Sequence, residues 1–299
     1  MKWLRRIGIV LGTLVGLVLV AVAAVYAASS RRLTKAYAVT PEPIAIPADS
    51  MSLARGRHLA TTIGKCTDCH TADLGGRAFI DDAAFGHIVA PNLTRGRGGL
   101  GGALTAVDYD RAVRHGVGRD GRPLIFIPAS SYRFMSDEDL GALVAYLKTI
   151  PPVDREHTPT KYNLLPRALM TFGKLPGPDA EVIDHSVMHV APVTPDTTVV
   201  YGNYLANIGG CTGCHNPTLS GGAVAGPRGT PAAANITTGG NLGKWTKAQF
   251  VETLRTGKRP DGYALDPFMP WKLAGQMTDD EMTAVWNYLR SVPAREFGK

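Results

Sequence analysis

One segment of the chain is apolar without interruption, and the rest alternates between short apolar stretches and loops. The segment Ile7–Ala28 contains 22 apolar or small residues. As a helix, a run of this length can cross the ~30 Å hydrocarbon core of a bilayer. A secretory signal peptide usually has a shorter apolar region, of about 7–15 residues. The pattern therefore favours an uncleaved transmembrane anchor, although Ala27-Ala28-Ser29 also matches the small residues of a cleavage site.

Two later segments have apolar residues at helical spacing, and each begins with a residue that suits a helix N-terminus. One follows Ser136 and the other follows Thr278. Both are good N-caps, and the acidic residues that come next suit the positive end of a helix. The apolar positions are Leu140, Leu143, Val144 and Leu147 in the first segment, and Met282, Val285, Trp286 and Leu289 in the second. We expect these stripes to be core.

All four cysteines of the chain lie in two Cys-x-x-Cys-His motifs, Cys66–His70 and Cys211–His215. This motif attaches a c-type haem, because its two thiols add to the vinyl groups of one porphyrin and the adjacent imidazole becomes an axial iron ligand. A lone Cys-x-x-Cys also occurs in zinc knuckles and in thioredoxin-like redox pairs. Here the histidine follows immediately in both copies. The sequence therefore predicts two haem c groups held by Cys66, Cys69, Cys211 and Cys214, with His70 and His215 as axial ligands.

The sequence around the two motifs is repeated as well. Gly56-Arg57-His58-Leu59-Ala60 precedes the first motif, and Gly202-Asn203-Tyr204-Leu205-Ala206 precedes the second. Equivalent cysteines are 145 residues apart, which is a domain-sized step. Between the helical segments the chain is rich in Gly and Pro and poor in strand pattern, so we expect loops there. The part after the anchor is therefore predicted to be two tandem copies of one fold.

Each copy resembles the class I cytochromes c, and the resemblance covers roughly residues 50–155 and 197–293. It implies an all-α fold, with two tandem cytochrome c-like haem domains after one N-terminal transmembrane helix. We divide the chain into an anchor and spacer, a first haem domain, a Pro-rich connector and a second haem domain, over residues 1–48, 49–155, 156–196 and 197–299.

Two linking segments carry several prolines and stand outside the repeat. We expect Tyr37–Pro47, with its three prolines, to be an extended spacer that lifts the first domain off the membrane. The connector is expected to be ordered, with one short helix near Leu164–Met170. Covalent haem attachment takes place outside the bacterial cytoplasmic membrane. The resemblance therefore implies a single-pass protein of that membrane with its haem domains facing the periplasm.

The net charge of +7 does not indicate nucleic-acid binding. Residues 1–48 contain six basic groups and one acidic group, so they carry +5 of that charge, and the haem domains are nearly neutral. Neither domain has a basic stripe with interleaved aromatic residues. The expected partners are redox proteins and the membrane, and no nucleic acid.

The two copies differ at the position of the sixth iron ligand. Class I cytochromes c commonly use a methionine sulfur as this ligand, often in a Met-Pro pair before the last helix. Met269-Pro270 matches that pattern. The aligned residues in the first copy are Ile127-Pro128, and an isoleucine cannot bind iron. Met135 is a tentative ligand there. Met135 also stands just before an N-cap, where an apolar residue is usual, so water, a distant histidine or an open site are the alternatives.

The resemblance extends to membrane-bound cytochromes c that serve dehydrogenases or oxidases. It implies a carrier that takes electrons from a dehydrogenase or a quinol-linked donor to an oxidase or another cytochrome, with no catalytic acid, base or nucleophile. A haem enzyme, such as a peroxidase or a sulfur-compound oxidoreductase, could instead use an open iron site in the first domain. A cytochrome subunit of a respiratory complex is a third possibility, for which Gly12-x-x-x-Gly16 is a weak helix-packing motif.

Overall fold

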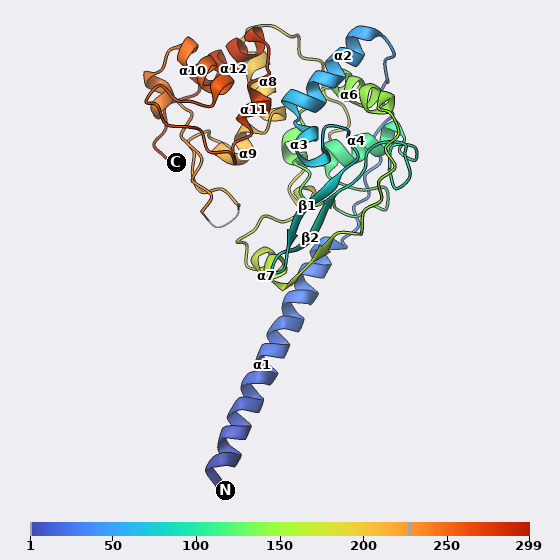
Figure 1. Ribbon diagram of the computed structural model, residues 1–299, viewed down its shortest axis with the longest axis vertical. Coiled ribbons are helices and arrows are strands. Elements are labelled where there is room, and N and C mark those ends of the chain that lie inside the picture. The colour runs from blue at the N-terminus through green and yellow to red at the C-terminus, as the bar shows by residue number, and fades with distance from the viewer. Residues whose placement is uncertain (1, 227–228) are drawn as a thin grey trace.

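The protein consists of a helical head on a long N-terminal helix (Figure 1). The computed structural model describes residues 2–226 and 229–299. The long helix is α1 (Lys2–Leu33), and the N-terminus lies at its far end. Among the described residues, α1 is the one helix long and apolar enough to cross a membrane, with a mean hydropathy of 2.7 in its most apolar window.

The head contains two units built from the same succession of helices. The first unit contains α2 (Ser50–His58), η1 (Leu59–Ile63), α3 (Cys66–His70), α4 (Ala106–His115), α5 (Ala129–Tyr132) and α6 (Asp137–Thr149). The second contains α8 (Val199–Ile208), α9 (Cys211–His215), η3 (Asn241–Lys244), α10 (Lys247–Thr256), α11 (Trp271–Ala274) and α12 (Asp279–Ser291). The prediction of a mainly helical, tandem fold is confirmed.

The opening and closing helices of each unit cross at a glycine. A Cβ atom at Gly56 of α2 would lie 1.9 Å from the Ala142 carbonyl oxygen of α6, and one at Gly202 of α8 would lie 1.9 Å from the Ala284 oxygen of α12. Only glycine allows this approach of two helix backbones. The same crossing in both units therefore fixes the position of each opening helix, and with it the point at which the following Cys-x-x-Cys-His helix begins.

The closing helices begin as the sequence predicts. The Ser136 side chain accepts a hydrogen bond from the Asp139 amide, and Thr278 forms a reciprocal capping box with Glu281. The apolar stripes of α6 and α12 are buried in one core that continues from the first unit into the second. The two units therefore share apolar packing in addition to polar contacts.

The first unit contains one more residue than the second in its opening helix. Gly56 and Cys66 are ten positions apart, whereas Gly202 and Cys211 are nine apart. The extra residue is absorbed by the π-helical turn η1, in which the Gly64 amide donates to the Leu59 carbonyl at 2.7 Å. Single-residue insertions in helices commonly produce such a turn, often at functional sites.

A small sheet also distinguishes the first unit. Strands β1 (Arg77–Asp82) and β2 (Gly86–Ala90) form an antiparallel hairpin, and β3 (Lys161–Tyr162) of the connector pairs with β2. The expectation of loops alone between the helices was wrong here, and it was also wrong where α4, α5, α10 and α11 form. In the second unit, the equivalent segment has the isolated bridge between Gly222 and Ala233.

The connector and the spacer both pack on the rest of the molecule. The connector contains the short helix α7 (Leu164–Thr171) and the 3-10 turn η2 (Asp179–Glu181), and α7 lies against the end of α1. The spacer is extended, but Val39 and Ile44 are buried, and Arg111 donates to the Val39 carbonyl at 2.8 Å. The spacer is therefore extended, as expected, and lies along the first unit; that it lifts this unit off the membrane stays a prediction.

Candidate functional site

Each Cys-x-x-Cys-His motif forms a five-residue helix with unusual backbone at both ends. Lys65 (φ 51°) precedes α3, and Gly210 (φ 73°) precedes α9. The residues that follow, Thr71 and Asn216, also have positive φ, 68° and 60°. Such left-handed conformations are costly for residues other than glycine. Their repetition in both units indicates that the presentation of the motif requires them.

The two histidines have the same hydrogen-bond partner type. Nδ1 of His70 lies 2.8 Å from the Pro91 carbonyl oxygen, and Nδ1 of His215 lies 2.7 Å from that of Ala234. A carbonyl can only accept, so Nδ1 carries the proton and Nε2 presents a lone pair. Burial lowers the pKa of both imidazoles, which favours this neutral form. A neutral imidazole held through its other nitrogen is the usual state of a metal-binding histidine.

No disulfide joins the four cysteines, and burial raises the pKa of each thiol, that of Cys66 to about 11. They are therefore neutral thiols at neutral pH, unlike the low-pKa cysteine of a thioredoxin-like pair. Within residues 2–226 and 229–299, no three His, Cys, Asp or Glu side chains gather as a metal site. The donor set suits thioether attachment to a porphyrin with one imidazole below it.

The loop after each motif is hydrogen-bonded to the backbone of the motif histidine. Buried Leu74 and Leu219 have φ values of 55° and 60°. Two residues later, the Gly76 and Gly221 amides donate to the carbonyls of the two motif histidines at 2.9 Å. In the first unit, the buried Tyr109 hydroxyl has no hydrogen-bond partner among the described residues. The two thiols of each motif and its neutral imidazole are the groups that covalent haem attachment requires, so the residues present fit a haem.

The loop expected to supply the sixth ligand has equivalent backbone in both units. The Ala129 amide donates to the Ile127 carbonyl at 2.8 Å, and the Trp271 amide donates to the Met269 carbonyl at 2.7 Å. Pro128 and Pro270, which follow, cap α5 and α11 with nearly the same dihedral angles. Ile127 therefore stands where Met269 stands, as the alignment predicted.

The same loop is one residue shorter in the first unit. The amides of Leu124 and Leu265 make equivalent 2.7 Å hydrogen bonds, after which three residues precede Pro128 but four precede Pro270. Phe126 takes a left-handed conformation, with φ 69°. The two units thus differ in the length of this loop as well as in the side chain that it presents.

Met135 is fully buried in the core just before the Ser136 cap. Its amide donates to Tyr132 at 2.8 Å, as the Met277 amide donates to Ala274 at 3.2 Å. Met277 is buried in the same core. Met135 and Met277 thus occupy equivalent core positions, although the second unit also has Met269.

The cytochrome c family model matches residues 53–151 and 199–293. The chain belongs to the cytochrome c family. Because the two matched regions each contain one Cys-x-x-Cys-His motif, the chain binds two haem c groups.

Several curated proteins are similar to this chain over most of its length. The fructose dehydrogenase cytochrome subunit of Gluconobacter japonicus is 28% identical, over 88% of this chain and 57% of that protein. The cytochrome c subunit of a quinone-dependent alcohol dehydrogenase of Gluconacetobacter polyoxogenes is 28% identical, over 86% and 58%. A dihaem c-type cytochrome of Cereibacter sphaeroides is 29% identical, over 78% and 83%. The chain spans little more than half of the two dehydrogenase subunits.

The two cytochrome domains meet close to their haem-attachment segments. Lys65, the residue before Cys66, donates through Nζ to the Ile63 carbonyl of its own domain at 2.9 Å and to the Gly209 carbonyl of the other domain at 2.6 Å. Gly209 lies two residues before Cys211. Burial lowers the pKa of Lys65. The half-buried Lys65 side chain, on a residue with a left-handed backbone, thus joins the two attachment segments. Comparison of the two copies within the chain gives one signal for this link, because Lys65 stands where the second copy has Gly210.

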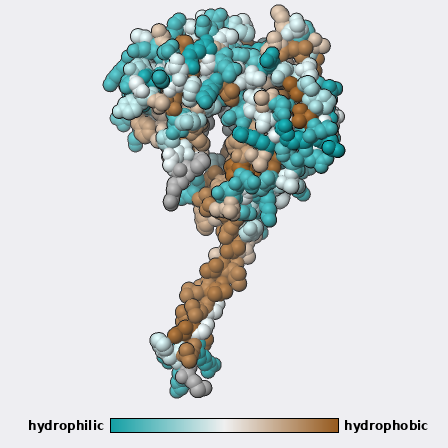
Figure 2. All heavy atoms as spheres, viewed as in Figure 1, coloured by the Kyte–Doolittle hydropathy of each residue, from teal (hydrophilic) through white to brown (hydrophobic). Residues whose placement is uncertain are grey.

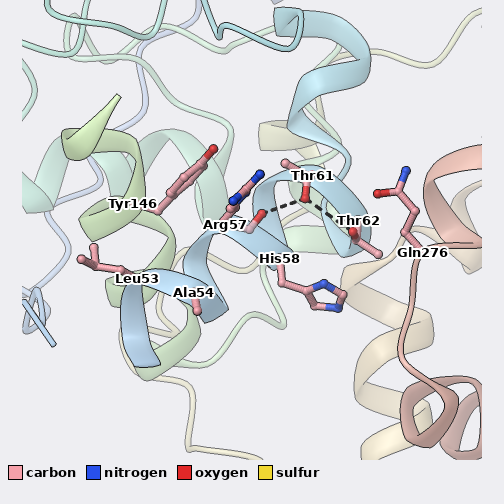
Figure 3. A pocket seen from close by; sticks show the side chains of 8 residues that line it. All are labelled: Leu53, Ala54, Arg57, His58, Thr61, Thr62, Tyr146 and Gln276. Atoms are coloured by element: carbon pink, nitrogen blue, oxygen red, sulfur yellow. Dashed lines mark hydrogen bonds between the residues drawn. The ribbon is translucent and has the colours of Figure 1, made fainter. Parts of the chain in front are cut away.

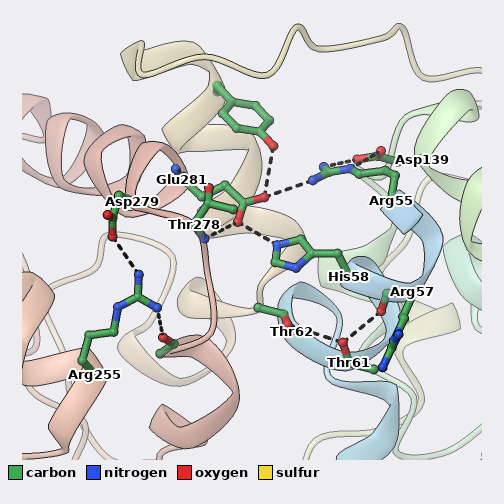
Figure 4. A network of polar contacts seen from close by, with 12 residues as sticks. Arg55, Arg57, His58, Thr61, Thr62, Asp139, Arg255, Thr278, Asp279 and Glu281 are labelled. Carbon is green, nitrogen blue, oxygen red and sulfur yellow. Dashed lines mark hydrogen bonds and ion pairs between the residues drawn. The ribbon is translucent and has the colours of Figure 1, made fainter. Parts of the chain in front are cut away.

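A second polar cluster, the interdomain clamp, joins the opening and closing helices of both domains (Figure 4). Arg55 pairs with Asp139 at 2.7 Å and with Glu281 at 3.0 Å, and Nε2 of His58 lies 2.7 Å from Glu281. The Tyr204 hydroxyl donates to Asp139 at 2.6 Å. His58 and Tyr204 are equivalent residues, and so are Asp139 and Glu281. The contacts are therefore reciprocal, as in an approximate two-fold arrangement.

The charge of Glu281 is stabilised despite its burial. Burial opposes ionisation, but hydrogen bonds from His58 and the Thr278 amide and the charge of Arg55 outweigh it and lower the pKa of Glu281. Beside the clamp, an open groove lies between the domains (Figure 3). Its lining comes from α2, η1 and α6 of the first domain, with Gln276 facing them from the second. The groove is polar and contains no haem-attachment residue, so we assign it no part in haem binding.

Proposed function

We propose that this protein is a membrane-anchored dihaem cytochrome c that relays electrons for a dehydrogenase. Two features support the proposal: the similarity to cytochrome subunits named for fructose and alcohol dehydrogenases, and the meeting of both haem-attachment segments at Lys65. The second observation carries it, because electrons pass best between redox groups held close together. The relatives do not favour the haem-enzyme alternative.

Each domain contributes its own haem-binding residues in this proposal. Each bound haem supplies one-electron redox chemistry, and the protein tunes it through axial ligands and burial. The thioether links come from Cys66 and Cys69 in the first domain and from Cys211 and Cys214 in the second, with His70 and His215 as axial ligands.

The sixth ligands make the two sites unequal. Met269 supplies a thioether in the second domain, which favours reduced iron and raises the potential. In the first domain, Ile127 supplies no ligand, and Met135 acts as a core residue in the way that Met277 does. The second haem is then the acceptor of higher potential.

The membrane position follows from α1. Its length and apolar surface are those of a single membrane span. We infer that α1 is not cleaved, because Ser29, at the candidate cleavage site, is fully buried and its hydroxyl accepts a hydrogen bond from Arg167. Since haem is attached outside the bacterial cytoplasm, the head faces the periplasm.

The experiment is the isolation of the untagged protein from membranes in mild detergent, with intact mass and a redox titration. We expect two covalent haems, roughly 1.2 kDa above the polypeptide, an intact N-terminal segment, two separate potentials and a copurifying dehydrogenase subunit. A matched variant, Cys211→Ser with Cys214→Ser, should keep only the first haem. Rapid turnover of peroxide or sulfur compounds by the isolated protein, without a partner, would contradict the relay.

A further inference from the structure

Helix α7 of the connector is fixed to the end of α1. Arg167 of α7 donates to the hydroxyls of Ser29 and Ser30 at 3.0 and 3.1 Å, and its guanidinium lies 4.8 Å from the centre of the Tyr26 ring. From α1, Arg32 donates to the Met170 carbonyl at 2.7 Å. Polar and cation–π contacts therefore hold α7 at a defined height along the membrane-spanning helix.

The contact with Tyr26 places α7 at the level of the membrane surface. Trp3 and Tyr26 lie 23 residues apart along α1, which is about 35 Å at the helical rise of about 1.5 Å per residue. Aromatic residues with this separation mark the two interfaces of a bilayer. Because Arg167 contacts the Tyr26 ring, α7 lies at the interface from which the head emerges.

The side of α7 turned away from α1 is apolar and exposed. Pro166 and Met170 are buried, whereas Leu164 and Leu165 are 40% and 43% exposed, and Phe172, just after the helix, is 70% exposed. The hydrophobic surface of α1 continues onto this base of the head (Figure 2). Contiguous exposed apolar side chains mark a contact with a membrane or with another protein, and here they adjoin a membrane-spanning helix.

Charge near α7 has the sign that anionic lipid head groups attract. Lys161 and Lys174 flank the helix and are exposed, and Arg31 lies in the last turn of α1. Short helices with an apolar face and neighbouring basic residues bind in the plane of a membrane interface.

We propose that α7 and Phe172 form a second membrane contact. In this contact, the Leu164, Leu165 and Phe172 side chains enter the interfacial layer of the leaflet on the side of the head. The proposal rests on the proposed anchoring by α1. It gives the head two attachments to the bilayer, and two attachments fix the orientation of both haem domains above the membrane.

The test uses the full haem-loaded chain in nanodiscs of phosphatidylcholine and phosphatidylglycerol. The photo-crosslinking residue p-benzoylphenylalanine replaces Phe172 in one variant and Tyr263 in a control, since Tyr263 is 71% exposed but belongs to the second domain. After irradiation, mass spectrometry should find a lipid adduct at position 172 and none at position 263.

The outcomes separate this proposal from the anchoring on which it rests. A protein that fails to enter nanodiscs would contradict the anchoring itself. A protein that enters them but gives no lipid adduct at position 172, or equal adducts at both positions, would overturn the contact by α7. An adduct between two copies of the chain in place of a lipid adduct would overturn it too, because α7 would then be a protein-binding surface.

Discussion

Replacement of Glu281 tests whether the interdomain clamp holds the two haem domains together. The Glu281 side chain is 6% exposed and accepts hydrogen bonds or ion pairs from Arg55, His58 and the Thr278 amide. Glu281→Ala removes all three, together with the 3.5 Å hydrogen bond from the Tyr201 hydroxyl, and leaves Arg55 with Asp139 as its remaining carboxylate. Loss of one partner of a buried ion pair costs about 3–5 kcal/mol, and because Arg55 keeps Asp139 we expect about 3 kcal/mol.

This loss corresponds to a Tm lower by ~6–12 °C, at ~2–4 °C per kcal/mol for a protein of this size. Glu281→Gln keeps the shape and should lose about 1–2 kcal/mol. The matched control is Asp279→Ala, two residues away, because its carboxylate is 89% exposed and pairs with Arg255 at 2.8 Å. An exposed pair of this kind contributes about 1 kcal/mol or less.

The assay is thermal unfolding of the haem-loaded protein, followed by circular dichroism and by haem absorption. The folded-state pKa of Glu281 is lowered, so its contribution is present above the usual carboxyl pKa of about 4.3 and is lost as the pH falls through the folded value. The difference between wild type and Glu281→Gln should therefore shrink below about pH 4. If Glu281→Ala is no less stable than Asp279→Ala at pH 7, the clamp does not hold the domains.

Three further predictions concern single positions in the first domain. Ile127→Met should convert the first haem to a low-spin spectrum and raise its potential, whereas Met135→Leu should leave the spectrum unchanged; loss of a methionine–iron band in Met135→Leu would make Met135 the ligand. Lys65→Gly places the residue of the second domain at this position and should lower both potentials in a redox titration, because a positive charge beside the haem-attachment segments favours reduced iron. Lys65→Arg keeps the charge and should leave the potentials unchanged. If Lys65→Gly leaves them unchanged as well, Lys65 is only a structural link. Burial raises the pKa of Asp110 to about 6, so the stability that it contributes is present below about pH 4 and is lost as the pH rises through 6. Asp110→Asn should then gain about 2–3 kcal/mol in urea unfolding at pH 7 and nothing at pH 4, and a loss at pH 7 would show an ionised Asp110 paired with Arg114.

Local signals in the sequence predicted the anchor helix α1, the closing helices α6 and α12 and the connector helix α7, but they missed α4 and α10, which lie where loops were expected. The caps at Ser136 and Thr278 and the two haem motifs depend on residues close together in the chain. The internal repeat gave further information, because the equivalence of Ile127 and Met269 follows only from aligning the two copies. The extra residue behind η1 could have been found in the same way, by counting from Gly56 and Gly202 to the motif cysteines.

Features that depend on distant partners were missed. The hairpin β1–β2 pairs with β3, and Thr160 of the connector accepts a hydrogen bond from the Val89 amide across 71 positions. The spacer packs because Val39 and Ile44 find apolar surface on the first domain. Lys65 gains its role from Gly209, 144 positions away. None of these partners leaves a periodic pattern in the segment itself.

The reciprocal contacts of the clamp are those of an isologous homodimer, in which one surface patch meets a copy of itself. A single-domain ancestor with such a patch could pair with itself only at sufficient concentration, and both of its iron sites would be identical. Gene duplication and fusion make the pairing intramolecular, so that the effective concentration no longer depends on expression. Each half can then change alone. The positions Lys65 and Gly210, and Ile127 and Met269, show where the halves have diverged within a shared interface.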